Sequence, residues 1–537
     1  MGIMICIFEP LQLYFTNIEE YWFDIYNLFP VCLKMFAALF GAGLLLFIMA
    51  RLIGYKFWKI IYIIYGVVFL CTYIQGNYLA GNLPLLDGSV VNWQNYDYQR
   101  KYTIILWSAV ILITALVGWK RKSEFVVKMY FYISSVVLSV LIVTCLITGM
   151  NNNGLLDKGD LTVTTDKFMT MSKEGKNFVI LLLDATRGEE MYELLMQDDE
   201  IRAKFKDFTY YDDTMGSYPL TNHSLHYVLS GDWYEYDELI NDYRTRVLLE
   251  APLFTELQNR DYSMELYTLE MPFVDNEGFY RFDNFKKKQA WFSSEWKLIK
   301  LELRLVGLKY APYDLKRRCL ALPDEFDNLK VVEDLEYEVY SPENSFFMQH
   351  LKEEMEYIPE NNFKFIHVNG AHVPFRYNRN VELIDGQTNY DEAVAAAANM
   401  AGAYIQKLQA SGVYDNTVII VLSDHGYNDE PYENLYYNPY GRQQPILFIK
   451  GFNEHHEEMQ VSEAPVAQGD LQEAYVKLMD GSYGSDVFPY KEGDQRERRF
   501  LWYRSDRSTH FEEYIQTGHA SNTETMIRTG KVYDWVD

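Results

Sequence analysis

Residues 418–430 read VIIVLSDHGYNDE, an apolar run that stops abruptly at Asp424 and His425, with Gly426 directly after them. A continuous apolar run of this length is typical of a buried strand covered on both faces. Neighbouring side chains on a strand point to opposite faces, but at its end two neighbours can turn toward one point. The stretch is therefore either an ordinary Asp-Gly turn or a carboxylate and an imidazole held together as a site.

Three further apolar runs have strand length: NFVILLLDA (177–185), KFIHVNG (364–370) and PILFIKG (445–451). Residues 390–412 form an alanine-rich amphipathic pattern, which predicts a helix closed by Gly412. Doubly covered strands that alternate with helices indicate an α/β domain with a largely parallel central sheet. In such sheets ligands bind at the carboxyl ends of the strands.

Side chains that can bind a metal follow three of these predicted strands. The first strand ends on Asp184, another ends near His367 and His372, and a third ends on Asp424 and His425. Carboxylate oxygens and imidazole nitrogens are suitable ligands for a divalent cation of borderline softness. Each group alone is unremarkable, but three converging strand ends predict a metal site.

A group-transfer site also needs a nucleophile, and residues 215–231 (MGSYPLTNHSLHYVLSG) offer a hydroxyl. Thr221 begins an apolar-periodic stretch after Pro219, and Gly231 closes it. A hydroxyl at a helix start faces the first amide N–H groups, which favour an anion such as phosphate. The alternative is that Thr221 is simply an N-cap, which is a very common use of threonine.

The 537 residues are too many for one ordinary domain, and the apolar residues concentrate before residue 150. Four segments there approach the roughly 20 residues that a membrane-spanning helix needs: 31–53, 58–75, 102–119 and 129–149. Residues 1–30 are aromatic-rich and suit a segment at the level of the lipid headgroups. We expect a membrane domain over 1–150, a linker over 151–175 and a catalytic domain over 176–537.

Charge indicates the orientation and the class of partner. The first and third loops between the spans carry the basic residues Arg51, Lys56, Lys59, Lys120, Arg121, Lys122 and Lys128. The positive-inside rule places these loops in the cytoplasm and the large C-terminal domain outside, on a multi-pass protein of the plasma membrane. That domain holds a single cysteine, Cys319, as is ordinary for exported proteins of bacteria that lack an oxidising periplasm. The net charge of −26 disfavours nucleic acid as a partner.

The strings LLLDATR, TNHSLHYVLSG, HVNGAHVP and YDNTVIIVLSDHG, in this order, resemble the alkaline-phosphatase superfamily. They are most similar to its sulfatase-like membrane phosphotransferases, the lipoteichoic acid synthases and lipid A phosphoethanolamine transferases. The resemblance implies a transmembrane α-helical bundle followed by an alkaline-phosphatase-like domain. It implies one divalent metal ion, Zn²⁺ or Mn²⁺, bound by Asp184, Thr221, Asp424 and His425. It also implies Thr221 as nucleophile and His372 as the residue that contacts the phosphoryl group or the leaving oxygen.

The activity that the resemblance implies is transfer of a phosphoglycerol or phosphoethanolamine headgroup through a phospho-threonine intermediate. The donor is then a phospholipid and the acceptor a cell-surface glycan or glycolipid. Two alternatives stay open. With water as acceptor the protein is a sulfatase-like hydrolase or phosphodiesterase, and without chemistry it is a surface-polymer-binding pseudoenzyme.

The chain departs from the family pattern at two places. Asp184 replaces the usual Glu ligand, and no further His follows soon after Gly426, which puts a second metal in doubt. True sulfatases oxidise a Cys or Ser to an aldehyde, whereas oxidation of Thr221 would give a ketone. Sulfate-ester hydrolysis is therefore disfavoured.

Overall fold

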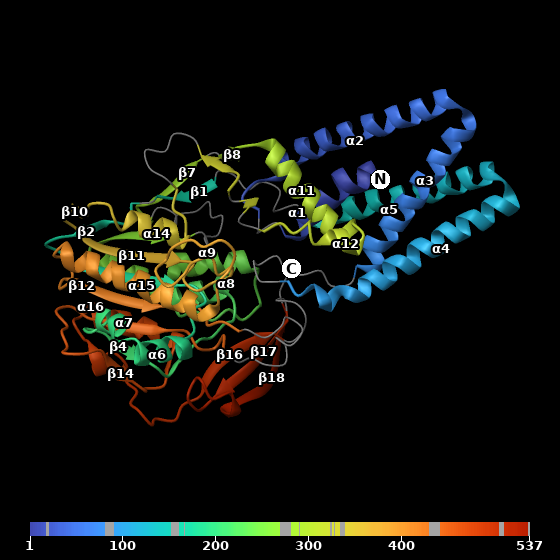
Figure 1. Cartoon of the computed structure of the whole chain (residues 1–537). Helices are drawn as coiled ribbons and strands as arrows, with labels where there is room; N and C mark the ends of the chain where they lie inside the picture. Colours follow the sequence, from blue (N-terminus) through green and yellow to red (C-terminus); the bar gives the residue numbers. More distant parts are fainter. Residues whose placement is uncertain are drawn as a thin grey trace. The chain divides into compact units, whose positions relative to one another are not determined.

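A computed structural model describes most of the chain and divides it into two compact units (Figure 1). The described residues are 1–17, 21–80, 91–151, 161–165, 167–268, 281–288, 290–322, 325–326, 328–332, 339–428, 441–503 and 510–534. Unit 1 comprises Met1–Leu161 and Lys288–Asp334, and unit 2 comprises Thr162–Lys287 and Leu335–Asp537. The expected domain limits at residues 150 and 176 stay predictions. The structure adds that 288–334 fold with the first unit.

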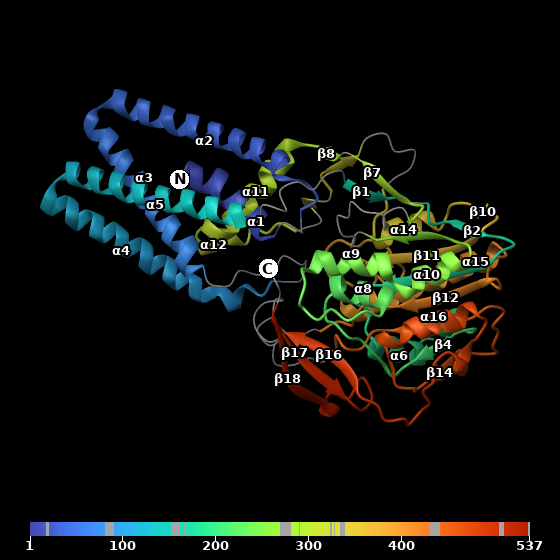
Figure 2. The same ribbon diagram turned by 180° about the vertical axis from the view of Figure 1, so that it is seen from behind.

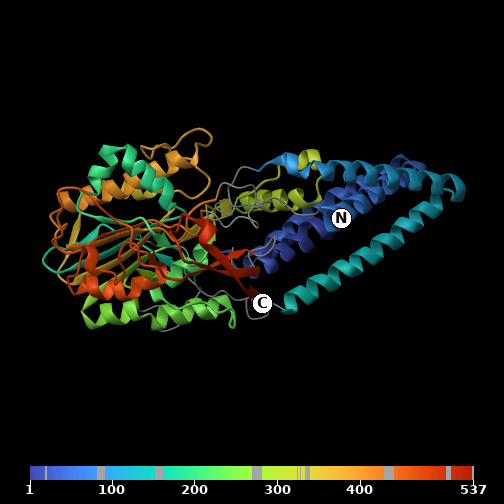
Figure 3. The ribbon, with the colours of Figure 1, turned by 90° about the horizontal axis from the view of Figure 1, so that it is seen from below.

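Four helices among the described residues are long and apolar enough to cross a membrane. They are α2 (Ile25–Ile53), α3 (Tyr55–Ile74) continued by η3 (Gln75–Leu79), α4 (Asp97–Arg121) preceded by η4 (Trp93–Tyr96), and α5 (Ser123–Asn151). Each contains one of the four predicted segments, so the prediction of four apolar N-terminal helices is confirmed (Figure 3). All four helices are longer than the predicted segments, because flanking residues continue the helical hydrogen bonds.

Shorter elements complete unit 1. They are η1 (Met4–Phe8), α1 (Glu9–Thr16), β8 (Ala290–Phe292), α11 (Glu295–Tyr310), α12 (Tyr313–Lys316) and β9 (Lys330–Val332). The apolar helix Met4–Thr16 is shorter than a span. Ser294 caps α11, because its hydroxyl accepts the N–H of Lys297.

Unit 2 is built on a sheet in which seven described strands take the order β14-β4-β13-β12-β3-β11-β6. Their bounds are β14 (Gln460–Ser462), β4 (Thr209–Tyr211), β13 (Leu447–Lys450), β12 (Thr417–Leu422), β3 (Asn177–Leu183), β11 (Asn361–Val368) and β6 (Tyr262–Tyr267). Every neighbouring pair is parallel except those of β13, which is antiparallel to β12 and β4. The largely parallel sheet is thus confirmed. The predicted strand at 445–451 exists but runs the other way.

Helices cover both faces of this sheet. Along β3, Val179, Leu181 and Leu183 belong to one buried cluster, and Phe178, Ile180 and Leu182 belong to another. The first cluster includes α6 (Gly188–Gln197), α7 (Asp199–Lys204), α14 (Asn344–His350) and α15 (Tyr390–Ala410), in front in Figure 1. The second includes α8 (Thr221–Ser230), α9 (Ile240–Glu250), α10 (Pro252–Asn259) and α16 (Leu471–Met479), in front in Figure 2. Burying each such side chain contributes about 1.5–3 kcal/mol, so the central strands are firmly held.

The remaining strands are peripheral. They are β1 (Leu161–Thr164), β2 (Thr170–Ser172), β5 (Thr214–Met215), β7 (Phe285–Lys288), β10 (Glu356–Ile358), β15 (Val466–Ala467), β16 (Arg498–Tyr503), β17 (His510–Gln516) and β18 (Met526–Asp534). The last three form an antiparallel sheet. The predicted helix over 390–412 is confirmed as α15.

Candidate metal centre

The register of the three central strands brings their carboxyl ends together. Leu422 of β12 lies opposite Leu182 of β3, and Val368 of β11 lies opposite Leu183. Because all three strands are parallel, the residues after them leave the sheet at one edge. Asp184 follows β3 directly at this edge.

Three predicted ligands meet there. Ligand atoms of Asp184, Asp424 and His425 all lie within 4.8 Å of one another, and the three residues are buried. Asp424 Oδ1 accepts the N–H of Ala185 at 3.1 Å, which joins the ends of β12 and β3. Asp184 Oδ1 is buried and has no hydrogen-bond partner among the described residues, and the buried Asp424 Oδ2 lies 3.2 Å from His425 Nε2. Two buried carboxylates this close together are costly unless a cation balances their charge, so the donor set fits a divalent metal.

The charges in this cluster favour the protonation states that bind metals. Burial alone would raise the pKa of Asp184, but the charges of His372, His367 and His425 outweigh burial and lower that pKa. Burial lowers the pKa of His425, and the charge of Asp424 opposes this effect only in part. An ionised carboxylate and a neutral imidazole are the ligand forms. His372 Nδ1 lies 2.6 Å from the carbonyl oxygen of Val373.

The Thr221 hydroxyl points toward the same cluster. Thr221 is the first residue of α8, but the N-cap is Leu220, and no side chain caps this helix. Thr221 Oγ1 lies 3.5 Å from Asp184 Oδ2 and 3.4 Å from His425 Nε2. The N-cap alternative is therefore not what the structure shows, and the hydroxyl is available to the centre.

The glycine that follows the Asp-His pair is required by close packing. A Cβ on Gly426 would lie 2.1 Å from the carbonyl oxygen of Gly441 and 3.0 Å from that of Gln444. The N–H of Gly426 donates to the carbonyl of Arg442 at 3.0 Å. The 441–444 segment thus lies directly on the turn and fixes the direction of His425, which is why the strand ends Asp-His-Gly.

We expect Gly426→Ala to weaken metal binding and to lower Tm. The added methyl group must push the 441–444 segment away, and overpacking of this kind costs about 1–3 kcal/mol. Gly188→Ala is the matched control, because its Cβ would meet Tyr210 Oη at an ordinary 3.4 Å. Metal titration and thermal unfolding of both variants give the answer. An unchanged metal affinity in Gly426→Ala would show that the turn does not position His425.

His367 lies against a metal ligand, a role that sequence reasoning did not assign. The sequence offered His367 and His372 together at this strand end, and the resemblance selected His372. His367 Nε2 lies 3.1 Å from Asp184 Oδ2, and its Nδ1 lies 3.1 Å from Thr268 Oγ1. This chain of contacts orients the carboxylate, as partners of metal ligands commonly do. Only the register, with His367 opposite Leu182, could have revealed it.

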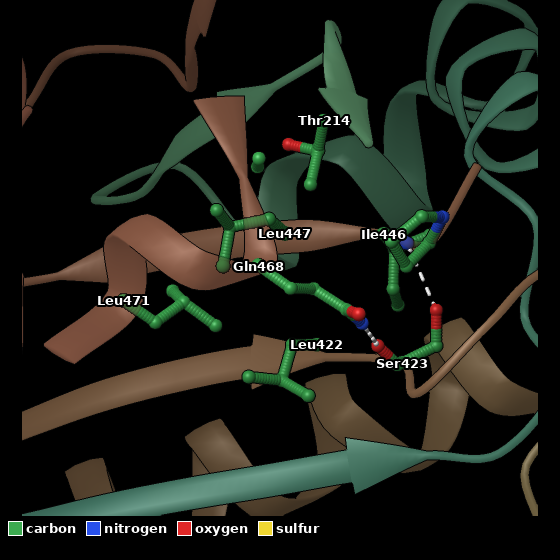
Figure 4. Close-up of a pocket in the computed structure, with 9 residues that line it drawn as sticks. Thr214, Leu422, Ser423, Ile446, Leu447, Gln468 and Leu471 are labelled. Carbon is green, nitrogen blue, oxygen red and sulfur yellow. Dashed lines mark hydrogen bonds between the residues drawn. The ribbon is translucent and has the colours of Figure 1, made fainter. Parts of the chain in front are cut away.

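Gln468 joins two loops of the site. Its Nε2 donates to the carbonyls of Asp424 at 2.6 Å and Ser423 at 3.2 Å, and its Oε1 accepts the N–H of Ser217 at 3.2 Å. Figure 4 shows the side chain extended beside Leu422 toward Ser423, at a small pocket behind the centre. Gln468 therefore links the turn that carries Asp424 to the segment leading into α8. No sequence motif marks it.

Two arginines near the centre differ in their contacts. Arg442 Nη1 donates to the carbonyl of Pro219 at 2.7 Å, and its charge adds to burial in lowering the pKa of His425. Sequence reasoning missed this cation. Arg187 forms a close ion pair with Glu190.

His223 and His226 on α8 have packing roles. The His223 ring stacks on Tyr218 and Tyr236, with centroids 5.6 and 5.7 Å apart. Burial lowers the pKa of His226 to about 3, so this imidazole is neutral at physiological pH. Both rings therefore help to fix α8, whose first residue is Thr221.

Comparison with known proteins bears on unit 2. A model of the sulfatase family matches residues 176–482, more than half of the chain. No curated protein sequence matches the chain.

A search of solved structures matches the chain to LtaP, EcEptC and PsFucS1. The lipoteichoic acid synthase LtaP from Listeria monocytogenes is 14% identical over 69% of this chain and 88% of its own, with a TM-score of 0.37. The C-terminal periplasmic domain of EcEptC from Escherichia coli is 12% identical over 68% and 95%, with a TM-score of 0.35. The sulfatase PsFucS1 from Pseudoalteromonas sp. is 13% identical over 67% and 84%, with a TM-score of 0.37.

Proposed function

Because the chain belongs to the sulfatase family, we propose that it is a membrane-anchored, metal-dependent phosphotransferase. The donor is a phospholipid, and the transferred group is its phosphoglycerol or phosphoethanolamine headgroup. The acceptor is a hydroxyl of a cell-surface glycan or glycolipid. The observation that carries the proposal is the Thr221 hydroxyl, which lies at a helix start within 3.5 Å of Asp184 and 3.4 Å of His425.

Threonine favours phosphoryl over sulfuryl chemistry. The aldehyde nucleophile of sulfatases requires a Cys or Ser precursor, because the methyl group of threonine would leave a ketone. A threonine alkoxide, in contrast, can attack phosphorus without prior oxidation. The N–H groups at the start of α8 and the Arg442 guanidinium provide positive charge for a phosphoryl group near Thr221.

Each residue of the site has a separate role in the first half of the transfer. Asp184, Asp424, His425 and Thr221 would hold one divalent ion, Zn²⁺ or Mn²⁺, and such an ion when bound makes the hydroxyl more acidic and offsets phosphoryl charge. The Thr221 hydroxyl gives its proton to solvent as Oγ1 forms a bond to phosphorus and the bond from phosphorus to the diacylglycerol oxygen breaks. His372 gives its proton to that leaving oxygen.

The second half of the reaction reverses these roles. The acceptor hydroxyl gives its proton to His372 as its oxygen attacks the phospho-threonine. The bond from phosphorus to Thr221 Oγ1 breaks, and this oxygen takes a proton from solvent, which regenerates the hydroxyl. Each half exchanges one ester of the same phosphoryl group for another, so no oxidant or nucleotide is needed.

The N-terminal helices support a lipid donor. Four apolar helices at the start of the chain keep the catalytic unit attached to a bilayer. The basic residues near Arg51 and Lys120 favour a cytoplasmic location for those loops, so the catalytic unit faces the outside of the plasma membrane. A bacterial envelope offers both phospholipid donors and glycan acceptors at that surface.

The proposal is tested with full-length protein in lipid nanodiscs supplied with Zn²⁺ or Mn²⁺. Phosphatidylglycerol and phosphatidylethanolamine, each labelled in the headgroup, are offered separately, with and without a glycolipid that carries a free primary hydroxyl. We expect diacylglycerol to form from one of them and the label to move to the glycolipid.

The other outcomes separate the alternatives. Label released to water even when the glycolipid is present would indicate a phosphodiesterase. Metal uptake without turnover of either lipid would contradict transfer from these donors and favour a pseudoenzyme. The Thr221→Val variant is the blank, because it keeps the shape of the side chain and lacks the hydroxyl.

A further inference from the structure

Residues 288–334 lie within the sequence of unit 2 but fold with the membrane helices of unit 1. The chain therefore passes between the two units three times, near residues 161, 287 and 334. A simple membrane anchor needs only the first of these connections. The return of residues 288–334 to the membrane unit therefore needs a separate explanation. The contacts of this segment indicate its role.

The segment contacts three of the membrane helices through polar side chains. Lys34 Nζ of α2 lies 2.6 Å from Glu295 at the start of α11. Gln75 Nε2, at the end of α3, donates to the carbonyl of Ala311 at 2.6 Å. Beside α4, Arg100 lies 2.9 Å from Asp314.

The contact points share one depth along the helices. Each lies 16 to 20 residues from a basic residue at the opposite end of its span: Lys34 from Arg51, Gln75 from Lys59, and Arg100 from Lys120. At 1.5 Å per residue this separation is about 24–30 Å, close to the thickness of the hydrocarbon core. If the basic residues mark one surface of the bilayer, the segment lies at the other.

Both ends of α11 are held at this level. Its first residue pairs with Lys34, and its last turn contacts α1, where Lys309 pairs with Glu9 at 2.8 Å and the Tyr310 hydroxyl donates to Glu9 at 2.8 Å. Tyr310 also packs directly on Gly76, where a Cβ would lie 2.2 Å from its ring. α11 is about 24 Å long, and its two ends contact different helices, α2 and α1. It therefore lies across the ends of the spans rather than along them (Figure 1).

The outward side of α11 has the composition of a headgroup-level surface. Trp296, Lys300 and Leu303 follow one another at spacings of four and three residues and share a face. Trp296 is 63% exposed and Leu303 is 44% exposed, and Lys300 Nζ lies 5.5 Å from the centre of the Trp296 ring. Trp at a membrane–water boundary, and Lys that extends its ammonium toward phosphates, are typical of this layer.

We propose that α11 is an interfacial anchor, which lies in the headgroup layer with Trp296, Lys300 and Leu303 against phospholipid. Its partner is the lipid surface around the spans, because the segment that carries the helix contacts those spans and its exposed face holds both apolar and cationic side chains. The anchor holds the catalytic unit to the bilayer at a second point besides the connection after α5. This inference rests on the proposed membrane placement and uses neither the metal nor a substrate.

The test measures the depth of α11 with single fluorescent labels. Lys300→Cys and Leu303→Cys are made separately in the full chain after Cys145 and Cys319, the two partly exposed cysteines, are replaced by Ala. Leu45→Cys, on the exposed side of α2, is the deep control, and Leu383→Cys, in unit 2, is the control outside the membrane unit. The labelled proteins are placed in nanodiscs that carry a nitroxide either on the headgroup or at the end of the acyl chain.

We expect headgroup nitroxide to quench labels at 300 and 303 several-fold more than the label at 383. The acyl-chain nitroxide should instead quench the label at 45 most strongly. Free access of aqueous iodide to positions 300 and 303, without lipid quenching, would overturn the proposal. Protection from both iodide and lipid quenchers would also overturn it, because a second copy or another protein would then cover the face.

A protease site placed between Asn151 and Leu161 tests the second attachment. After cleavage, the C-terminal fragment should stay with the nanodisc through residues 288–334, and its release would contradict an anchor. Neither measurement depends on turnover. The anchor can therefore fail while the phosphotransferase proposal stands, and the reverse also holds.

Discussion

Thr221→Val should abolish headgroup transfer, by a factor on the order of 10⁴ or more, while the protein folds as stably as the unaltered chain. The large effect follows from the loss of the attacking oxygen, since valine keeps the shape of the side chain. Loss of a helix cap would cost about 0.5–2 kcal/mol, but Leu220 is the N-cap of α8, and the Thr221 hydroxyl faces Asp184 and His425 instead. The measurements are transfer of labelled headgroup and thermal unfolding.

The conservative variant sharpens this prediction. Thr221→Ser keeps an oxygen at the same place and should retain part of the activity, because a primary alkoxide can still attack. A phosphorylated peptide covering residues 216–231 should be trapped from the unaltered protein incubated with its donor, and it should be absent from Thr221→Val. Robust turnover by Thr221→Val, whether or not this variant is less stable, would show that Thr221 is not the nucleophile. The proposed mechanism would then be wrong.

Asp424→Asn should lose metal binding and activity together while the fold persists. Asparagine keeps an oxygen that can accept the N–H of Ala185, so the link between β12 and β3 survives. It removes one of two buried negative charges, those of Asp424 and Asp184, whose ligand atoms lie within 4.8 Å of each other. Because those charges are what a cation would balance, we expect metal affinity to fall at least 100-fold.

Thermal unfolding with and without metal measures this effect. A ligand that binds only the folded state at 1,000 times its Kd stabilises that state by about 4.1 kcal/mol, so added Zn²⁺ or Mn²⁺ should raise the Tm of the unaltered protein. The metal should not raise the Tm of Asp424→Asn, whose metal-free Tm should match or exceed that of the unaltered protein. Asp415→Asn is the control, because Asp415 lies before β12 at the opposite edge of the sheet and is exposed. Full metal uptake by Asp424→Asn would mean that the centre lies elsewhere.

Local patterns were enough to predict the elements of this protein and most of its candidate ligands. Apolar runs of about 20 residues predicted the four N-terminal helices. Continuous apolar runs of strand length, typical of strands covered on both faces, predicted β3, β11 and β12. These patterns can be recognised because burial requires apolar residues at regular positions along each helix or strand. Polar residues placed directly after such runs, such as Asp184 and Asp424, are predictable for the same reason: parallel strands expose their ends at one edge.

Contacts between distant parts of the chain decided the rest. His367 lies beside Asp184 because of the register between β11 and β3, and Gln468 reaches Asp424 from a segment that carries no motif. The direction of β13 and the return of residues 288–334 to the membrane unit are likewise absent from any local pattern. A sequence shows which residues are buried or polar within a few turns of one element. Which elements become neighbours depends on packing summed over the whole chain, and only the tertiary structure reveals it.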